Sequence, residues 1–284
     1  MAPPPSASLP LQERVLTLMK TLQFGWFAGH LVLLLCIFRY SLSYIRMNYY
    51  ARMAQFSYRT AFVAAAITYG IVVYKTWRAR QKVGAKYPAG GPIGLLSDEN
   101  VQYLLMALVW LLSPQYPLAM LPYGIYSVFH VATYLRQNVI PTIQPVKPAA
   151  GASPSAKPAS NPIADAIGQF VKSYYDMSMS VVSTLEIALW VRILLSAILF
   201  QRRSWILIVL YTAFLRARFS QSSHVQNSFS MVEARVDSLV GQQNTPPVAR
   251  QIWDTVKQIA RQFHDVSDVS KYINGGSAVP KKTS

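Results

Sequence analysis

Four stretches of this chain carry almost no charge and are apolar enough to enter a lipid bilayer. Such runs exclude most water-soluble folds, because a helix on a soluble protein keeps one polar face toward water. The stretches are Leu22–Phe38, Thr60–Tyr74, Asn100–Leu135, and Thr184–Phe200 with its continuation Trp205–Leu215. The chain is therefore predicted to be an integral membrane protein that enters the bilayer several times.

The composition supports a membrane protein. Charged residues make up 13% of the chain, about half of the roughly 25% typical of soluble domains. The net charge of +16 is carried mostly by Lys and Arg residues that flank the apolar stretches. Anionic lipids of the cytoplasmic leaflet are the expected counter-charge for such residues. The expected partners are thus the bilayer and its anionic lipids, and nucleic acid is only a minor alternative.

Prolines divide the third stretch. Pro114, Pro117 and Pro122 would each interrupt a helix, so two helices over 101–112 and 118–135 are predicted. Thr60–Tyr74 is shorter than the roughly 20 residues of a perpendicular span, which leaves both shallow hairpins and full spans open. The predicted fold is an all-α polytopic membrane protein with short helical hairpins and C-terminal amphipathic helices.

Basic and proline-rich segments predict the organisation of the chain. The loop 75–86 holds only basic charges, which favours the cytosolic side. The Pro- and Ala-rich segment 141–162 is typical of a disordered linker, also cytosolic. The predicted divisions are an N-terminal tail 1–21, a membrane region 22–140, the linker 141–162, a second membrane region 163–220 and a cytosolic C-terminal region 221–284.

Two kinds of polar sequence lie beside or inside the apolar stretches. The tyrosine- and arginine-containing segment between Arg39 and Arg59 is interpreted as a connector at the level of the lipid headgroups. Glu186 and Arg192 would be costly in lipid. Glu186 is expected near the membrane interface, and Arg192 is expected to face protein or to reach toward water. An ion or proton pathway stays a minor alternative.

The segment from Pro247 to His264 has the pattern of an amphipathic helix. Its apolar residues share one arc of about 140°, with basic residues beside the arc, which is typical of a helix that lies on a membrane surface. Packing of this face on protein is the alternative. The residues expected to contact the membrane are Val248, Arg250, Ile252, Trp253, Val256, Lys257, Ile259, Arg261 and Phe263. A preceding helix, Val225–Val240, lacks a basic excess and is expected to pack on protein.

The last residues of the sequence carry a possible targeting signal. Lys281 and Lys282 lie four and three positions from the carboxyl end. They resemble the dilysine signal that returns membrane proteins to the endoplasmic reticulum, which requires a cytosolic tail.

Two motifs suggest a family. The segment Leu121–Tyr134 carries Pro122, Tyr126, His130, Thr133 and Tyr134 at spacings that resemble a signature of the transmembrane protein 33 family. A second match is the segment 211–220, and the order of features agrees from residue 22 to about 263. The long Pro/Ala linker and the extended tail favour the fungal pore-membrane nucleoporin type.

The resemblance implies a role and a location. Members shape endoplasmic reticulum tubules with reticulon-type proteins and support the assembly or distribution of nuclear pore complexes. Fungal members contact an import receptor and bind membrane through a C-terminal helix. The expected location is the endoplasmic reticulum membrane and the nuclear envelope, with nucleoporins among the partners and the C-terminus in the cytosol.

The sequence contains little that suggests catalysis. The four histidines are scattered, and no phosphate-binding glycine loop, nucleophile elbow or HExxH motif occurs. We expect no enzyme activity and no cofactor or metal, and interpret His130 and Tyr134 as an interhelical contact. A transporter or channel for ions or small solutes is the first alternative, and a membrane-embedded enzyme is the second.

Overall fold

The computed structural model describes residues 9–84, 92–145, 161–243 and 245–267, and every regular element in these ranges is helical. Four helical segments are long and apolar enough to cross a membrane: α2 (Leu22–Ile45), α3 (Arg52–Lys82), the segment Pro117–Ile143 around α6 (Met120–Tyr134), and α8 (Pro162–Ile198). This confirms the predicted all-α polytopic membrane fold.

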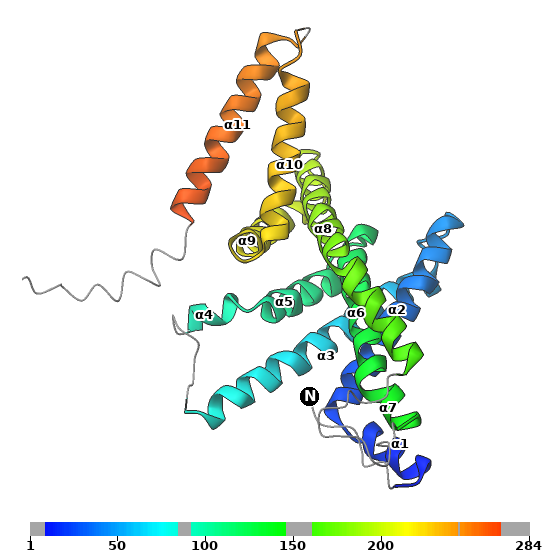
Figure 1. Ribbon diagram of the computed structural model, residues 1–284. Coiled ribbons are helices and arrows are strands. Elements are labelled where there is room, and N and C mark those ends of the chain that lie inside the picture. Colours follow the sequence, from blue (N-terminus) through cyan, green and yellow to red (C-terminus); the bar gives the residue numbers. More distant parts are fainter. Residues whose placement is uncertain (1–8, 85–91, 146–160, 244, 268–284) are drawn as a thin grey trace, which may run out of the picture.

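Shorter helices complete the chain (Figure 1). They are α1 (Leu11–Met19), α4 (Pro92–Leu96), α5 (Glu99–Leu112), a 3-10 turn (Pro117–Ala119), a π-helical turn (Leu135–Val139), α7 (Ile140–Ile143), α9 (Ser204–Gln221), α10 (Ser223–Val240) and α11 (Pro247–Val266). In the membrane region α2 packs along α3, α3 along α5, and α6 lies between α2 and α8. Helices α10 and α11 form a hairpin that projects from this bundle.

The helices are longer than the apolar stretches that predict them. Helix α3 has 31 residues and α8 has 37, so polar turns extend each apolar segment at one or both ends. By length and apolarity, α3 is sufficient for a full span. The split of the third stretch is confirmed, because α5 ends at Leu112 and the next helical turn begins at Pro117.

The segment between Arg39 and Arg59, interpreted as a connector, is helical for most of its length. Helix α2 continues to Ile45 and α3 begins at Arg52, which leaves only a short turn between them. Tyr40 and Tyr58 from this region are buried, with ring centroids 5.6 Å apart. Tyrosine can be buried this way because its ring is apolar and its hydroxyl finds a partner. The Tyr58 hydroxyl accepts a hydrogen bond of 3.1 Å from the Tyr116 backbone N–H.

Local signals fix the ends of α8. The side chain of Asn161 accepts hydrogen bonds from the N–H groups of Ile163 and Ala164, and Pro162 occupies the first helical position. At the other end, Phe200 and Arg203 adopt positive φ angles of 52° and 64° and turn the chain into α9. The predicted break between the two apolar parts of the fourth stretch is therefore confirmed.

Part of the predicted 141–162 linker lies outside the described residues. Its described ends are helical, since α7 extends to Ile143 and α8 begins at Pro162. The Arg14 guanidinium donates a 2.6 Å hydrogen bond to the Thr142 carbonyl oxygen, which attaches α1 to this end of the segment.

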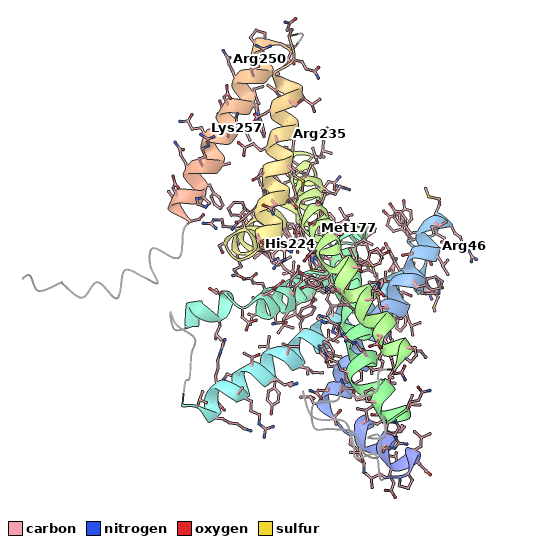
Figure 2. All side chains as sticks on the ribbon, in the orientation of Figure 1. Arg46, Met177, His224, Arg235, Arg250 and Lys257 are labelled. Carbon is pink, nitrogen blue, oxygen red and sulfur yellow. The ribbon has the colours of Figure 1, made fainter. Side chains whose placement is uncertain are left out.

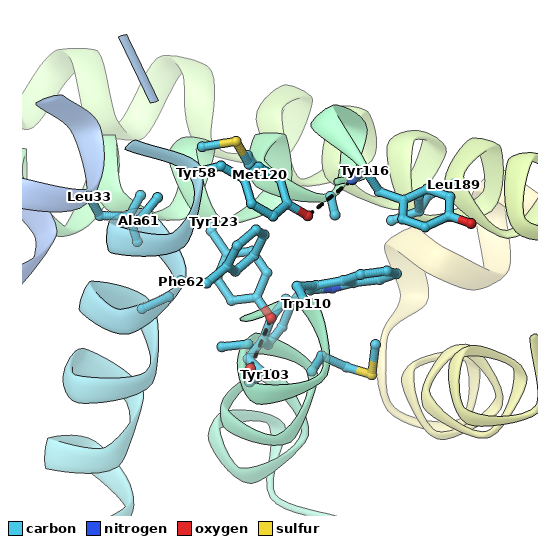
Figure 3. Packing of buried hydrophobic residues seen from close by; sticks show 14 of the residues in the cluster. Leu33, Tyr58, Ala61, Phe62, Tyr103, Trp110, Tyr116, Met120, Tyr123 and Leu189 are labelled. Carbon is cyan, nitrogen blue, oxygen red and sulfur yellow. Dashed lines mark hydrogen bonds between the residues drawn. The ribbon is translucent and has the colours of Figure 1, made fainter. Parts of the chain in front are cut away.

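The core of the membrane region is rich in aromatic side chains (Figure 3). Trp110 from α5 is 1% exposed and packs against Tyr116 and Tyr211. The Tyr123 hydroxyl donates a 2.9 Å hydrogen bond to the Tyr103 carbonyl oxygen. Helix α5 is too short to be a full span, and these contacts hold it between α3, α6 and α9.

Candidate functional site: the C-terminal hairpin and a buried polar cluster

Helix α11 presents an apolar face that no described part of the chain covers. None of its residues is buried. The side chains of Val248, Ile252, Val256, Ile259 and Phe263 are between 46% and 63% exposed. Burying one such side chain fully contributes about 1.5–3 kcal/mol, so a face with five of them has much to gain from an apolar partner. The alternative that this face packs on protein therefore finds no support within the described residues.

The other side of α11 contacts α10 through one acidic residue. The Asp237 carboxylate accepts a 2.6 Å hydrogen bond from the Trp253 indole N–H and a 2.9 Å hydrogen bond from the Lys257 ammonium. The Lys257 ammonium also lies 5.8 Å from the centroid of the Trp253 ring. Arg250 donates to the Gln242 carbonyl oxygen. Three of the predicted membrane-contact residues, Arg250, Trp253 and Lys257, thus contact the α10 side of the hairpin, while Arg261 is exposed.

The far end of α11 is held by α9. The Arg216 guanidinium donates a 2.8 Å hydrogen bond to the Ser267 hydroxyl and a 3.3 Å one to the His264 carbonyl oxygen. The rings of Phe219 and His264 meet edge to face with centroids 5.7 Å apart. Polar contacts at the middle and at the end of α11 thus keep its apolar face turned outward.

Helix α10 differs from the expectation. Of its residues only Val225 and Ser228, in its first turns, are buried. Met231, Val232 and Leu239 are exposed. Within the described residues the apolar face of α10 is buried only at the start of the helix, because the rest of α10 projects beyond α8 and α9 (Figure 1).

The contact around Asp237 should respond to pH. Its hydrogen bonds from Trp253 and Lys257 lower the pKa of the Asp237 carboxyl, and the bond to Asp237 raises the pKa of Lys257. Because the pKa of Asp237 is lowered, its contribution to folding stability is complete above the pKa of an aspartate in the unfolded chain, about 3.9. That contribution is lost as the pH falls through the pKa of Asp237 in the folded protein. Because the pKa of Lys257 is raised, its contribution to folding stability is complete below the pKa of a lysine in the unfolded chain, about 10.4. That contribution is lost as the pH rises through the pKa of Lys257 in the folded protein.

We therefore expect the contact of Asp237 with Trp253 and Lys257 to hold from about pH 5 to pH 9 and to weaken in acid. The measurement is the NMR shift of the Trp253 indole N–H, identified by its loss in Trp253→Phe. Asp237→Asn should show at neutral pH the shift that the unaltered protein shows only in acid. An indole shift that is the same in both proteins at neutral pH would contradict the contact.

A second polar site lies inside the helical bundle. Glu186 of α8 is 1% exposed and lies inside the helical bundle, whereas its position relative to the membrane interface stays a prediction. Its carboxylate accepts a short hydrogen bond from the Tyr103 hydroxyl and lies 3.6 Å from the Arg218 guanidinium. Arg218 also donates a 2.6 Å hydrogen bond to Glu99. A cation and a hydroxyl from other helices thus offset part of the free-energy cost of burying Glu186, whose Oε2 atom makes no hydrogen bond among the described residues.

Arg218 is the residue of this cluster that our sequence reasoning missed. It lies in the second family motif, 211–220, where it follows an apolar run and resembles an ordinary flanking cation. Its guanidinium is buried over the Tyr103 ring, 5.3 Å from the centroid. Arg192, which was singled out, lies on an exposed part of α8 and donates to the Ser196 hydroxyl.

A cavity of about 430 Å³ lies beside this cluster. It is formed by α5, α6, α8 and the junction of α9 with α10, with Tyr69 of α3 at its wall. His224 at the foot of α10, labelled in Figure 2, is part of the wall, and its ring lies within 3.4 Å of the Ser180 hydroxyl of α8.

The family-motif residues divide between the cavity and the packing of α6. Tyr126, His130 and Thr133 line the cavity. Pro122 is buried in the core, and the Tyr134 ring stacks on Phe27 of α2 with centroids 4.5 Å apart.

His130 makes the interhelical contact that its position suggests. Its ring centroid lies 4.7 Å from that of His30 and 4.9 Å from that of Trp26, both on α2. In the part of the chain that the structure describes, no group of three His, Cys, Asp or Glu side chains could hold a metal ion. The possible retrieval signal, Lys281 and Lys282, lies outside the described residues.

Comparisons with known proteins identify relatives along nearly the whole chain. The chain is 64% identical to Nucleoporin POM33 of Chaetomium thermophilum over 287 aligned residues, which cover 99% of each protein. It is 31% identical to Tetra-spanning protein 1 of Schizosaccharomyces pombe, with 93% of this chain and 91% of that protein covered. It is 28% identical to the Pore membrane protein of 33 kDa of Saccharomyces cerevisiae, with 98% and 94% covered.

No solved structure shows significant similarity to the chain. The family model described as Transmembrane protein 33/Nucleoporin POM33 matches residues 6–264, which include the apolar segments, the Pro122–Tyr134 motif and nearly all of α11. The chain therefore belongs to the transmembrane protein 33/nucleoporin POM33 family.

Proposed function

We propose that this protein organises membrane at the nuclear pore and in the endoplasmic reticulum, and that α11 binds the cytosolic surface of curved bilayer. The names of its relatives, a nucleoporin and a pore membrane protein, support the pore location. The single observation that carries the role of α11 is its exposed apolar face, held outward by contacts on its opposite side.

The chemistry of α11 fits a lipid surface. An interfacial helix buries aliphatic and aromatic side chains at the boundary of headgroups and acyl chains, and basic side chains beside them attract anionic lipid. Ile252, Ile259 and Phe263 supply the first feature and Arg261 the second. Trp253 is bound to Asp237 and contributes less than the sequence pattern suggests.

The wider role rests on the family. Shaping of reticulum tubules, assembly or distribution of pores, and contacts with reticulon-type proteins, nucleoporins and an import receptor are parts of the proposal, with a cytosolic C-terminus. A transporter is less well supported, because Glu186 and Arg218, two buried charges of the bundle, pair with each other. Mutual pairing of this kind stabilises packing between helices without requiring a pathway for ions.

The membrane contact of α11 can be tested on the full chain reconstituted in vesicles. Cys36 is replaced by Ser to give a background without cysteine, and an environment-sensitive fluorophore is attached to Ile252→Cys. We expect a blue-shifted emission that spin-labelled lipids quench, stronger in small vesicles than in large ones. The same label on Gln258→Cys, on the polar side of α11, is the control and should stay in water.

Charges on the apolar face should abolish the contact. Ile259→Glu combined with Phe263→Glu removes two large apolar side chains, worth about 3 kcal/mol or more together. The equilibrium constant for contact of α11 with the membrane should therefore fall by about 100-fold or more. Quenching at position 252 that persists in this double variant, or that is equal at position 258, would refute the proposal for α11.

A further inference from the structure

The cavity beside Glu99 and Arg218 has the features of a lipid headgroup site. We propose that it binds the phosphocholine headgroup of a membrane phospholipid, with the quaternary ammonium between Glu99 and the tyrosine wall. Its volume of about 430 Å³ lies within the range of roughly 300–1,000 Å³ found for small-ligand pockets. Nothing in the proposed role of α11 depends on this site.

The charges around the cavity favour a cationic group. Two carboxylates, Glu99 and Glu186, share the single guanidinium of Arg218. Glu186 is fully buried behind Tyr103, whereas the Glu99 side chain is 46% exposed and lines the cavity. When the two carboxylates and the guanidinium are ionised, one negative charge is in excess. Glu99 is the carboxylate of the pair that a ligand can reach. An ammonium group would supply the missing positive charge.

The wall is also aromatic. Cation–π attraction to tyrosine rings is the usual means by which proteins recognise choline-type ammonium groups. Tyr126 of α6 donates a 3.1 Å hydrogen bond to Glu99, so ring and carboxylate lie on the same part of the wall. The ring of Tyr175 is held edge to face against Phe129. The cavity tyrosines are Tyr69, Tyr103, Tyr126 and Tyr175.

Another part of the wall suits a phosphate. It is the beginning of α10, where Ser222 is the N-cap residue and Ser223 and His224 follow. The first N–H groups of a helix have no acceptor within that helix, and the helix dipole favours an anion there. The Ser223 and His224 side chains are further possible donors. A zwitterion with its ammonium toward Glu99 and its phosphate toward the start of α10 therefore finds a partner for each of its charges.

The position of the cavity favours a lipid over a free solute. Glu99 is the first residue of α5 and Ser222 precedes α10, so two helix ends meet there. Unpaired groups at helix ends are avoided in the hydrocarbon region and belong at the level of headgroups or in protein. Phe129, Val171 and Met179 form an apolar part of the wall on α6 and α8, beside which acyl chains can continue.

The test is native mass spectrometry of the full chain, purified in a maltoside detergent and titrated with dihexanoylphosphatidylcholine. Dihexanoylphosphatidylglycerol and free phosphocholine are titrated in parallel. Tyr175→Leu should weaken binding of the choline lipid by about 2- to 30-fold, since one cation–π contact is lost. Its matched control is Tyr174→Leu, because Tyr174 neighbours Tyr175 on α8, is similarly exposed at 49% against 45%, and does not line the cavity.

A second variant separates charge from shape. Glu99→Gln keeps the size of the side chain and should weaken binding by at least about fivefold, with thermal unfolding measured to show that the fold is intact. Equal binding of the glycerol lipid, or equal losses in Tyr174→Leu and Tyr175→Leu, would overturn the ammonium site. Free phosphocholine bound as tightly as the lipid would overturn the assignment to a lipid.

Discussion

Replacing Arg218 by methionine is expected to destabilise the protein by about 3–5 kcal/mol, because it leaves Glu186 buried without its cation. The Glu186 carboxylate would keep only the hydrogen bond from the Tyr103 hydroxyl. Glu99 would lose its 2.6 Å partner as well, but its more exposed side chain can be solvated. The measurement is the free energy of unfolding in mixed micelles, followed by far-UV circular dichroism.

Two comparisons make this prediction specific. Arg218→Met combined with Glu186→Gln should recover much of the loss, because an amide can still accept from Tyr103 and carries no charge that needs compensation. Arg216→Met, two positions earlier on α9, removes only contacts to Ser267 and His264 and should cost less than about 1 kcal/mol. Equal losses in Arg216→Met and Arg218→Met would show that the buried pair has no special role.

Trp110→Ala should also cost about 3–5 kcal/mol, the usual loss for a large aromatic side chain removed from a core. Trp110 is 1% exposed and lies between Tyr116 and Tyr211. Trp110 is the largest fully buried side chain of this short helix. The variant should therefore increase hydrogen exchange in α5 before the rest of the bundle, in addition to lowering the free energy of unfolding.

The control for Trp110 is Trp77→Ala on α3. Trp77 is 44% exposed, so its removal leaves no internal cavity and should change the free energy of unfolding by less than about 1 kcal/mol. Faster exchange in α5 of the Trp110 variant, with α3 unaffected, is the expected pattern. A uniform increase over all helices would instead mean that α5 is not a separately held element.

The two candidate sites share one part of the chain. Arg218 closes the buried cluster, and Ser222 and His224, which border the cavity, lie at the start of α10. Helix α9 also holds the end of α11 through Arg216. The α9–α10 junction therefore connects the membrane-embedded helices to the hairpin that carries the exposed apolar face.

The helices could be predicted from the sequence because their signals are local. Apolar stretches gave the membrane segments, prolines separated α5 from α6, and Pro247 marked the start of α11. The helical extent of the segment 39–59 was missed because its polar aromatic residues resemble a headgroup connector. Only packing shows that Tyr40 and Tyr58 are buried with their hydroxyl groups hydrogen-bonded. The apolar face of α11 could also be predicted from the 3.6-residue period, because periodicity depends only on neighbours along the chain.

Tertiary structure alone decided which polar groups meet. Glu186 on α8, Tyr103 on α5 and Arg218 on α9 come together only when three helices dock with particular rotations about their axes. The outward direction of the α11 face was likewise set by Asp237 on another helix, which binds Trp253 and Lys257. Sequence periodicity fixes what each helix can present, whereas the mutual orientation of packed helices fixes what is buried, paired or left exposed.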